Sequence, residues 1–219
     1  MAAVTVPDII PVFPLPGTVL LPSEILPLHI FEPRYRRMVE DVLESHRLIG
    51  MIQPAEGQED LLEGSPEVRD VGCVGLITRH QRLDDGRFLI WLLGLSPFRV
   101  GTEVSAEADY RQFRIEPRLH EPDGDEEEAA RALRFDLMSA FASQVVARAE
   151  TLAPFLEQMA RADHQQFLAA AAQLLSLSAS TRQRMLEESS LLQRFRMIRE
   201  AFLKRTGRPS LPQESRPAF

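Results

Sequence analysis

Short apolar runs separated by turn residues dominate the first half of the chain. β-branched and aromatic residues are frequent in these runs, and the repeated prolines make helices unfavourable there. The segment LDDG, residues 83–86, is typical of a hairpin turn between two such runs. The pattern predicts roughly six or seven short strands in a closed or nearly closed antiparallel barrel. The predicted strand regions are 8–31, 47–54, 68–78, 87–95, 96–104 and 109–117.

One helix is predicted within this region, in the segment EPRYRRMVEDVLESH. Pro33 suits the first helical position, where its missing N–H costs nothing, and Glu32 places negative charge at the positive end of the helix dipole. A solvated helix face is favoured over a phosphate site, because Pro33 removes one backbone donor and Glu32 is a competing anion. The predicted buried stripe is Tyr35, Met38, Val39 and Val42, and the basic residues of this corner are Arg34, Arg36 and Arg37.

The hydrophobic period becomes helical from Ala129 onward. Leu133, Leu137, Phe141 and Val145 recur at intervals of four and predict one buried seam. Helix starts are indicated by three spacings of an N-cap residue and a glutamine: Asp163 with Gln166, Ser180 with Gln183, and Ser190 with Gln193. The predicted fold class is α+β. Its parts are a β subdomain (1–118), an acidic linker and helix start (119–128), a helical bundle (129–206) and a flexible tail (207–219).

Composition narrows the classes of partner. The formal net charge of −7 opposes a phosphate backbone, and no nucleic-acid partner is expected. Cys73 is the only cysteine, which excludes an intrachain disulfide and a cysteine-rich zinc site. No apolar run reaches the roughly 18–20 residues that span a bilayer, and the first residues do not resemble a secretory signal. We therefore expect a cytoplasmic protein with no membrane partner.

The sequence contains no motif for catalysis, a cofactor or a metal. It has no G-x-x-x-x-G-K-[ST] loop and no G-x-S-x-G elbow. Lys204, its only lysine, lies beside Arg205 near the end of a helix, which does not suit a serine–lysine dyad. The five histidines lack metal-ligand spacing. His29 and Trp91 stand in apolar strand patterns; we expect core positions for both, with the lining of a cleft as the alternative.

The segment PVFPLPGTVLLPSEILPLHIFEPRYRRMV, residues 11–39, resembles the start of the Lon N-terminal domain, the substrate-binding module of the ATP-dependent Lon proteases. The similarity continues through VGCVGLI, DGRFLIWLLGLSPFRV and YRQFRIEP and extends over roughly residues 8–205. It implies a PUA-like, mostly antiparallel β-barrel followed by a helical bundle. The motif residues that we take as scaffold, and as candidates for binding, are Pro14, Leu15, Pro22, Pro27, Phe31, Glu32, Pro33, Arg34 and Tyr35.

The resemblance implies a function in binding polypeptides. A full Lon protease also has an ATPase and a peptidase module, so the chain looks like a stand-alone Lon domain that is not an enzyme. Its expected partners are polypeptide substrates or partner proteins, in the role of an adaptor or regulator of proteolysis. Two alternatives stay open. One is an enzyme or small-molecule-binding protein that uses the crevice between barrel and bundle, and the other is RNA binding through the PUA-like fold. The sequence specifies no oligomeric state.

Overall fold

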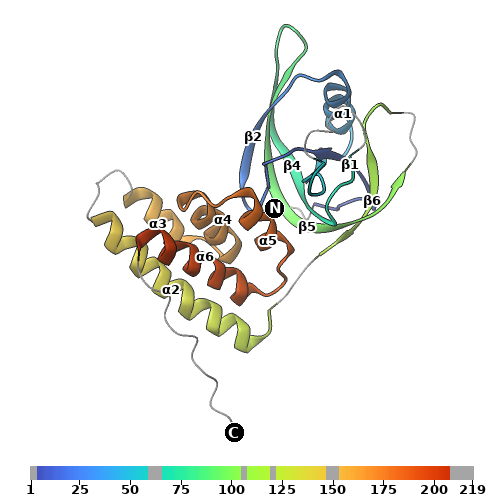
Figure 1. Cartoon of the computed structure of the whole chain (residues 1–219). Helices are drawn as coiled ribbons and strands as arrows, with labels where there is room; N and C mark the ends of the chain where they lie inside the picture. The colour runs from blue at the N-terminus through green and yellow to red at the C-terminus, as the bar shows by residue number, and fades with distance from the viewer. Residues whose placement is uncertain (1–3, 59–65, 105–107, 119–121, 147–152, 208–219) are drawn as a thin grey trace. The chain divides into compact units, whose positions relative to one another are not determined.

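The structure, a computed structural model, describes residues 4–58, 66–104, 108–118, 122–146 and 153–207. The chain divides into two compact units (Figure 1). The first comprises residues 1–121 together with 178–187, and the second comprises residues 122–177 together with 188–219. The first unit carries the strands and the second consists of helices, which confirms the α+β class.

The strands of the first unit close into a ring. The sheet order is β2-β5-β4-β3-β1-β6, and an additional pairing of β5 with β6 closes it. β1 and β3 are parallel and the other pairs are antiparallel, as expected for a mostly antiparallel barrel. The strands are β1 (Ile9–Pro14), β2 (Ile25–Ile30), β3 (Leu48–Ile52), β4 (Val71–Arg82), β5 (Phe88–Val104) and β6 (Gln112–Pro117).

Strand β5 joins two segments that were predicted as separate strands, 87–95 and 96–104. β5 pairs with β2 up to Leu93 and with β6 from Phe98 onward, so Pro97 falls between these two neighbours. A register shift against β4 lies just before it, between Gly94 and Ser96. Pro97, which has no N–H for the ladder, thus stands where the neighbour on one side of β5 changes from β2 to β6.

The barrel interior is apolar and α1 (Pro33–Leu43) packs against this unit. The helix buries Tyr35, Met38, Val39 and Val42, which confirms the predicted stripe. The Tyr35 ring lies 4.3 Å from the Phe13 ring, measured between centroids. Glu32 is the N-cap residue and Pro33 the first residue of the helix, as predicted. The barrel core consists of Ile10, Val12, Leu48, Ile52, Val74, Phe98, Phe113 and Ile115.

Helix α5 (Ala179–Glu187) groups with the β strands, whereas the sequence placed it in the helical bundle. Gln183, which is 3% exposed, donates from Nε2 to the carbonyl oxygen of Val71 at 2.9 Å. Arg118 donates to the carbonyl oxygen of Glu187 at 3.0 Å. These contacts join residues 112 and 69 positions apart, which local periodicity cannot reveal.

The second unit contains α2 (Gly124–Val146), α3 (Ala153–Arg161), α4 (His164–Leu174) and α6 (Leu191–Thr206). α2 and α6 lie side by side (Figure 1). The predicted seam of α2 is buried at Leu133, Leu137 and Phe141, and the Phe141 ring meets Phe202 of α6 edge-on at 5.2 Å. The Val145 side chain lies outside the described residues, as does the predicted tail from residue 208 onward.

Two of the three predicted caps are confirmed. Asp163 and Gln166 form a capping box at the start of α4, and the Ser190 hydroxyl accepts from the Gln193 N–H at the start of α6. The third was wrong: Ser180 lies within α5, and the Ser178 hydroxyl accepts from the Thr181 N–H instead. Serines stand both before and within the start of α5. Spacing alone selected Ser180 as the N-cap, two residues after the serine that caps the helix.

Candidate binding surface on the β2–β5 face

The outward side of β2 and β5 is an apolar surface. The pleat of β2 directs Ile30, which is 2% exposed, into the unit, and directs Ile25, which is 59% exposed, outward. The register places the outward residues of β2 beside those of β5, as the pairs Ile25 with Leu93, Pro27 with Trp91 and His29 with Leu89. Phe31, one residue beyond β2, is 60% exposed. We call Ile25, Pro27, His29, Phe31, Leu89, Trp91 and Leu93 the β2–β5 face.

Aromatic groups stand at the centre and at one end of the β2–β5 face. Trp91 is half-buried, and the guanidinium carbon of Arg79 lies 4.9 Å from the centroid of its ring. The His29 and Phe31 rings lie 6.0 Å apart between centroids. The expectation that His29 is a core residue was wrong, since its outward position in the pleat leaves it exposed. Trp91 and His29 thus belong to one surface, and a cleft lined by them stays a prediction.

Strand β2 has a free edge, because among the described residues it pairs with β5 alone. The Gly94 N–H donates to the carbonyl oxygen of Glu24 at 2.8 Å. In an antiparallel ladder the residues alternate between those that bond the neighbouring strand and those that point away from it. The backbone groups of Ile25, Pro27 and His29 therefore point toward the free edge. Pro27 lacks an N–H at the middle of this edge. A proline in this place is a known means of preventing edge-to-edge association.

The corner that follows β2 is built by local contacts. Arg34 forms an ion pair with Glu32 at 2.9 Å, and its guanidinium carbon lies 4.6 Å from the centroid of the Tyr35 ring. Burial raises the pKa of the Tyr35 hydroxyl, while the nearby Arg34 charge opposes this shift. Pro33 is exposed, and Tyr35 is buried. These contacts shape the corner that leads from the β2–β5 face into α1, and a scaffold role for its residues stays a prediction.

Pro14 ends β1, and Leu15 and Pro22 lie in the connection from β1 to β2. Pro14 and Pro22 are buried and Leu15 is half-buried. The Leu15 N–H donates to the carbonyl oxygen of Ile52, and the Gln53 side chain donates to the carbonyl oxygens of Leu15 and Thr18. These contacts suit a scaffold role for Pro14, Leu15 and Pro22, which stays a prediction. Gln53 was not recognised from the sequence, because its partners precede it by 38 and 35 residues.

Four members or neighbours of the surface were also missed: Ile25, Arg79, Leu89 and Leu93. The run FLIWLLGL was predicted as an apolar strand with Trp91 in the core, but every second residue of the run is only half-buried. A useful signal was available. In a strand that pairs at the edge of a sheet, apolar residues at both the inward and outward positions indicate an exposed apolar surface.

The described residues contain no cluster suited to metal binding, and their cysteine is buried. They contain no group of three or more His, Cys, Asp or Glu side chains that could hold a metal ion. Cys73 is fully buried, and burial raises the pKa of its thiol far above the ordinary range. A thiol in this environment stays protonated and is a poor nucleophile.

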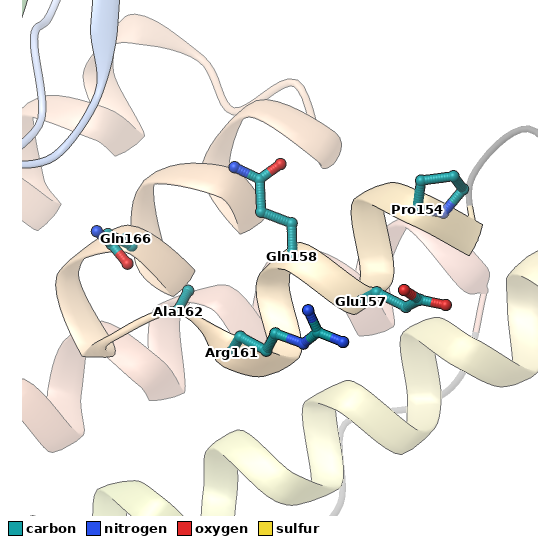
Figure 2. Close-up of a pocket in the computed structure, with 6 residues that line it drawn as sticks. All are labelled: Pro154, Glu157, Gln158, Arg161, Ala162 and Gln166. Carbon is teal, nitrogen blue, oxygen red and sulfur yellow. The ribbon is translucent and has the colours of Figure 1, made fainter.

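A hollow in the second unit differs in character from the β2–β5 face. It has a volume of about 360 Å³ and lies on α3 and the start of α4 (Figure 2). Its polar lining consists of Glu157, Gln158, Arg161 and Gln166, beside Pro154 and Ala162. Gln166 is engaged in the cap of α4, where its side chain accepts from the Asp163 N–H. The hollow is open and polar, and we assign it no function.

None of the helices in the described segments combines the length and the apolar character that crossing a membrane demands.

The fold places the chain among α+β proteins with the architecture of the Lon N-terminal domain. The N-terminal domain of a Mycobacterium avium complex Lon protease superposes with a TM-score of 0.67 at 12% identity, covering 89% of this chain and 97% of the other. A Lon N-terminal domain protein from Xanthomonas campestris gives a TM-score of 0.55 at 20% identity, covering 88% and 97%.

The family is established by sequence. The family model of the ATP-dependent protease La (LON) substrate-binding domain matches residues 9–204, and the chain belongs to this family. It is 35% identical over 111 residues to Lon protease 2 of Sorangium cellulosum and 28% identical over 111 residues to the Lon protease of Desulfosudis oleivorans. These matches cover 50% and 49% of this chain but only 13% and 14% of the relatives. The chain thus spans a small part of the proteases it matches.

Proposed function

We propose that the protein is a non-catalytic module that binds extended, apolar segments of polypeptides on the β2–β5 face. The observation that carries the proposal is the exposure of Ile25 and Phe31, at 59% and 60%, on a sheet face that also holds Trp91. Exposed apolar surface of this kind marks interaction sites, and tryptophan is enriched at the centre of binding surfaces. Membership of a substrate-binding family supports a polypeptide as the occupant.

The non-catalytic part of the proposal rests on the sequence and on the extent of the family match. The chain lacks a nucleotide-binding loop, and the matched family is the substrate-binding domain. We further propose that the module presents bound segments to a partner, as an adaptor or regulator of proteolysis. A cytoplasmic location is part of this proposal, since a single buried cysteine suits a reducing compartment.

Binding to an unfolded protein tests the proposal. Fluorescently labelled α-lactalbumin, reduced and S-carbamidomethylated so that it stays unfolded, is titrated with the protein, and anisotropy is recorded. The native disulfide-bonded form with the same label is the folded control. We expect saturable binding of the unfolded form and none of the native form. Equal affinity for both forms, or no binding, would refute the proposed function.

The two alternative functions give distinguishable results. ATP hydrolysis or casein cleavage by homogeneous protein would contradict the non-catalytic assignment. An RNA oligomer that binds with an affinity falling steeply as salt is added would favour the RNA alternative, because phosphate contacts release counterions. The net charge of −7 favours the polypeptide over RNA.

A further inference from the structure

We infer that the β2–β5 face selects apolar segments that carry an acidic side chain, and that Arg79 binds its carboxylate. This inference rests on the proposed function and specifies the class of polypeptide. It starts from one row across three strands: the register aligns Arg79 of β4 with Trp91 of β5, and Trp91 with Pro27 of β2. Arg79 thus borders the β2–β5 face on the side away from the free edge of β2.

The Arg79 guanidinium is oriented by the indole but is not neutralised. Its central carbon lies 4.9 Å from the centroid of the Trp91 ring, a distance typical of cation–π contacts. Two other arginines of the same hairpin are paired: Arg82 with Glu40 at 3.2 Å and Arg87 with Asp85 at 2.6 Å. Within the part of the chain that the structure describes, Arg79 forms no ion pair with a carboxylate. Its donors remain available to a ligand.

The surrounding strands do not neutralise Arg79. β2 and β4 contain no aspartate or glutamate, and β5 contains none before Glu103. His80 and Arg82 stand opposite the inward residues Ile90 and Phe88, so Arg79 is the cation of β4 on the Trp91 side. In a chain with a net charge of −7, the apolar region around Trp91 therefore carries a positive charge. Charge complementarity at such a surface favours acidic partners and disfavours basic ones.

The geometry also sets where the acidic residue lies in the bound segment. Neighbouring strands are about 4.8 Å apart, so Arg79 lies roughly 10 Å from the row of β2 side chains. A segment extended over Leu89, Trp91 and Leu93 has its apolar side chains against these residues. A glutamate or aspartate two residues from one of them points to the same side of the segment, faces the sheet and reaches Arg79 on the β4 side. A guanidinium forms charge-assisted, bidentate hydrogen bonds with a carboxylate, which an amide cannot replace.

The experiment uses short peptides without tryptophan, so that the emission of Trp91, the only tryptophan, reports binding. The peptides are acetylated and amidated, alternate apolar with polar residues, and differ only by Glu, Gln or Lys at one central position on the apolar side of the segment. We expect the Glu peptide to bind about three- to tenfold more tightly than the Gln peptide at low salt, and the Lys peptide to bind most weakly. A Gln peptide with a free C-terminus tests whether a terminal carboxylate substitutes for the side chain; we expect no gain.

The Arg79→Gln variant should bind the Glu and Gln peptides equally. Arg99→Gln is the matched control, because Arg99 is an exposed arginine of β5, the strand of Trp91, but lies beyond Pro97, and this variant should keep the preference. If wild-type protein binds the peptides without discriminating Glu from Gln, the inference is wrong while the proposed function stands. If no peptide changes Trp91 emission or binds at all, both fail. An RNA oligomer that competes with the Glu peptide through Arg79 would also overturn the inference.

Discussion

The guanidinium of Arg182 on α5 pairs with the carboxylate of Glu24, a residue 158 positions earlier in the chain. Both side chains are only 14% exposed. Arg182 also donates to the carbonyl oxygen of Val19 at 3.0 Å, and Glu24 accepts from the Leu21 N–H at 3.0 Å. The pair thus fixes the turn that leads directly into β2 and the β2–β5 face. A segment distant in sequence therefore supports the candidate binding surface.

Replacing Arg182 should destabilise the first unit. Arg182→Ala leaves the Glu24 carboxylate largely buried without its cation and leaves the Val19 carbonyl without this donor. Removing one partner of a buried ion pair lowers the free energy of unfolding by about 3 kcal/mol. Urea unfolding followed by Trp91 emission measures this loss. Arg184→Ala, an exposed position on the same helix, is the control and should change stability by less than about 0.5 kcal/mol. Equal stability of the two variants would show that the pair contributes little.

Replacing an exposed apolar residue of the β2–β5 face by a polar one should weaken polypeptide binding without unfolding the protein. Phe31→Ser removes an exposed ring from the β2–β5 face, and we expect about a tenfold loss of affinity for unfolded α-lactalbumin, or about 1.4 kcal/mol. The matched control is Phe135→Ser on α2, since Phe135 is 72% exposed and belongs to the other unit. Circular dichroism checks that both variants stay folded. A similar loss in both would mean that general surface hydrophobicity, rather than this face, determines binding.

The corner after β2 offers a smaller stability test. Arg34→Glu places a second carboxylate beside Glu32, which lies 2.9 Å from the native guanidinium, and removes the cation over the Tyr35 ring. Both side chains are partly exposed, so solvent screens the effect, and we expect a loss of about 1 kcal/mol. Thermal unfolding at low and high salt measures it, and the loss should shrink as salt is added. If stability is unchanged but α-lactalbumin binding is lost, the corner contacts the ligand directly.

Local rules predicted much of the fold and less of the surface. Pro33 after Glu32 and the spacing of Asp163 with Gln166 determine helix starts through neighbouring backbone groups, and both were predicted correctly. The membership of α5 depends on Gln183 meeting Val71, a contact that no period or cap encodes. The position of Arg79 beside Trp91 likewise depends on the register of two strands. Apolar periodicity identifies buried faces, but it does not show which apolar face remains without a covering element.

Alkaline pH should loosen the contact between Tyr110 and α1. The Tyr110 hydroxyl donates to Asp41 at 2.9 Å; burial, with this carboxylate as a further cause, raises the pKa of Tyr110 to about 12. The folded protein therefore holds this proton more tightly than the unfolded chain, whose tyrosine pKa is about 10. The contribution to stability is complete below pH 10 and is lost as the pH rises toward 12. Unfolding free energies measured across this range, with Tyr110→Phe as the comparison, should show a smaller alkaline decline in the variant.

Restoring a backbone donor at Pro27 should promote self-association through the free edge of β2. Pro27→Val supplies the missing N–H between Ile25 and His29 and adds a residue that favours strands, so two copies can pair edge to edge. Sedimentation velocity should show a concentration-dependent dimer that is absent from the wild type. Pro27→Lys is the matched control: it supplies the same N–H, but its charge opposes pairing of two edges. A monomeric Pro27→Val variant, or equal association of both variants, would show that the proline does not protect this edge.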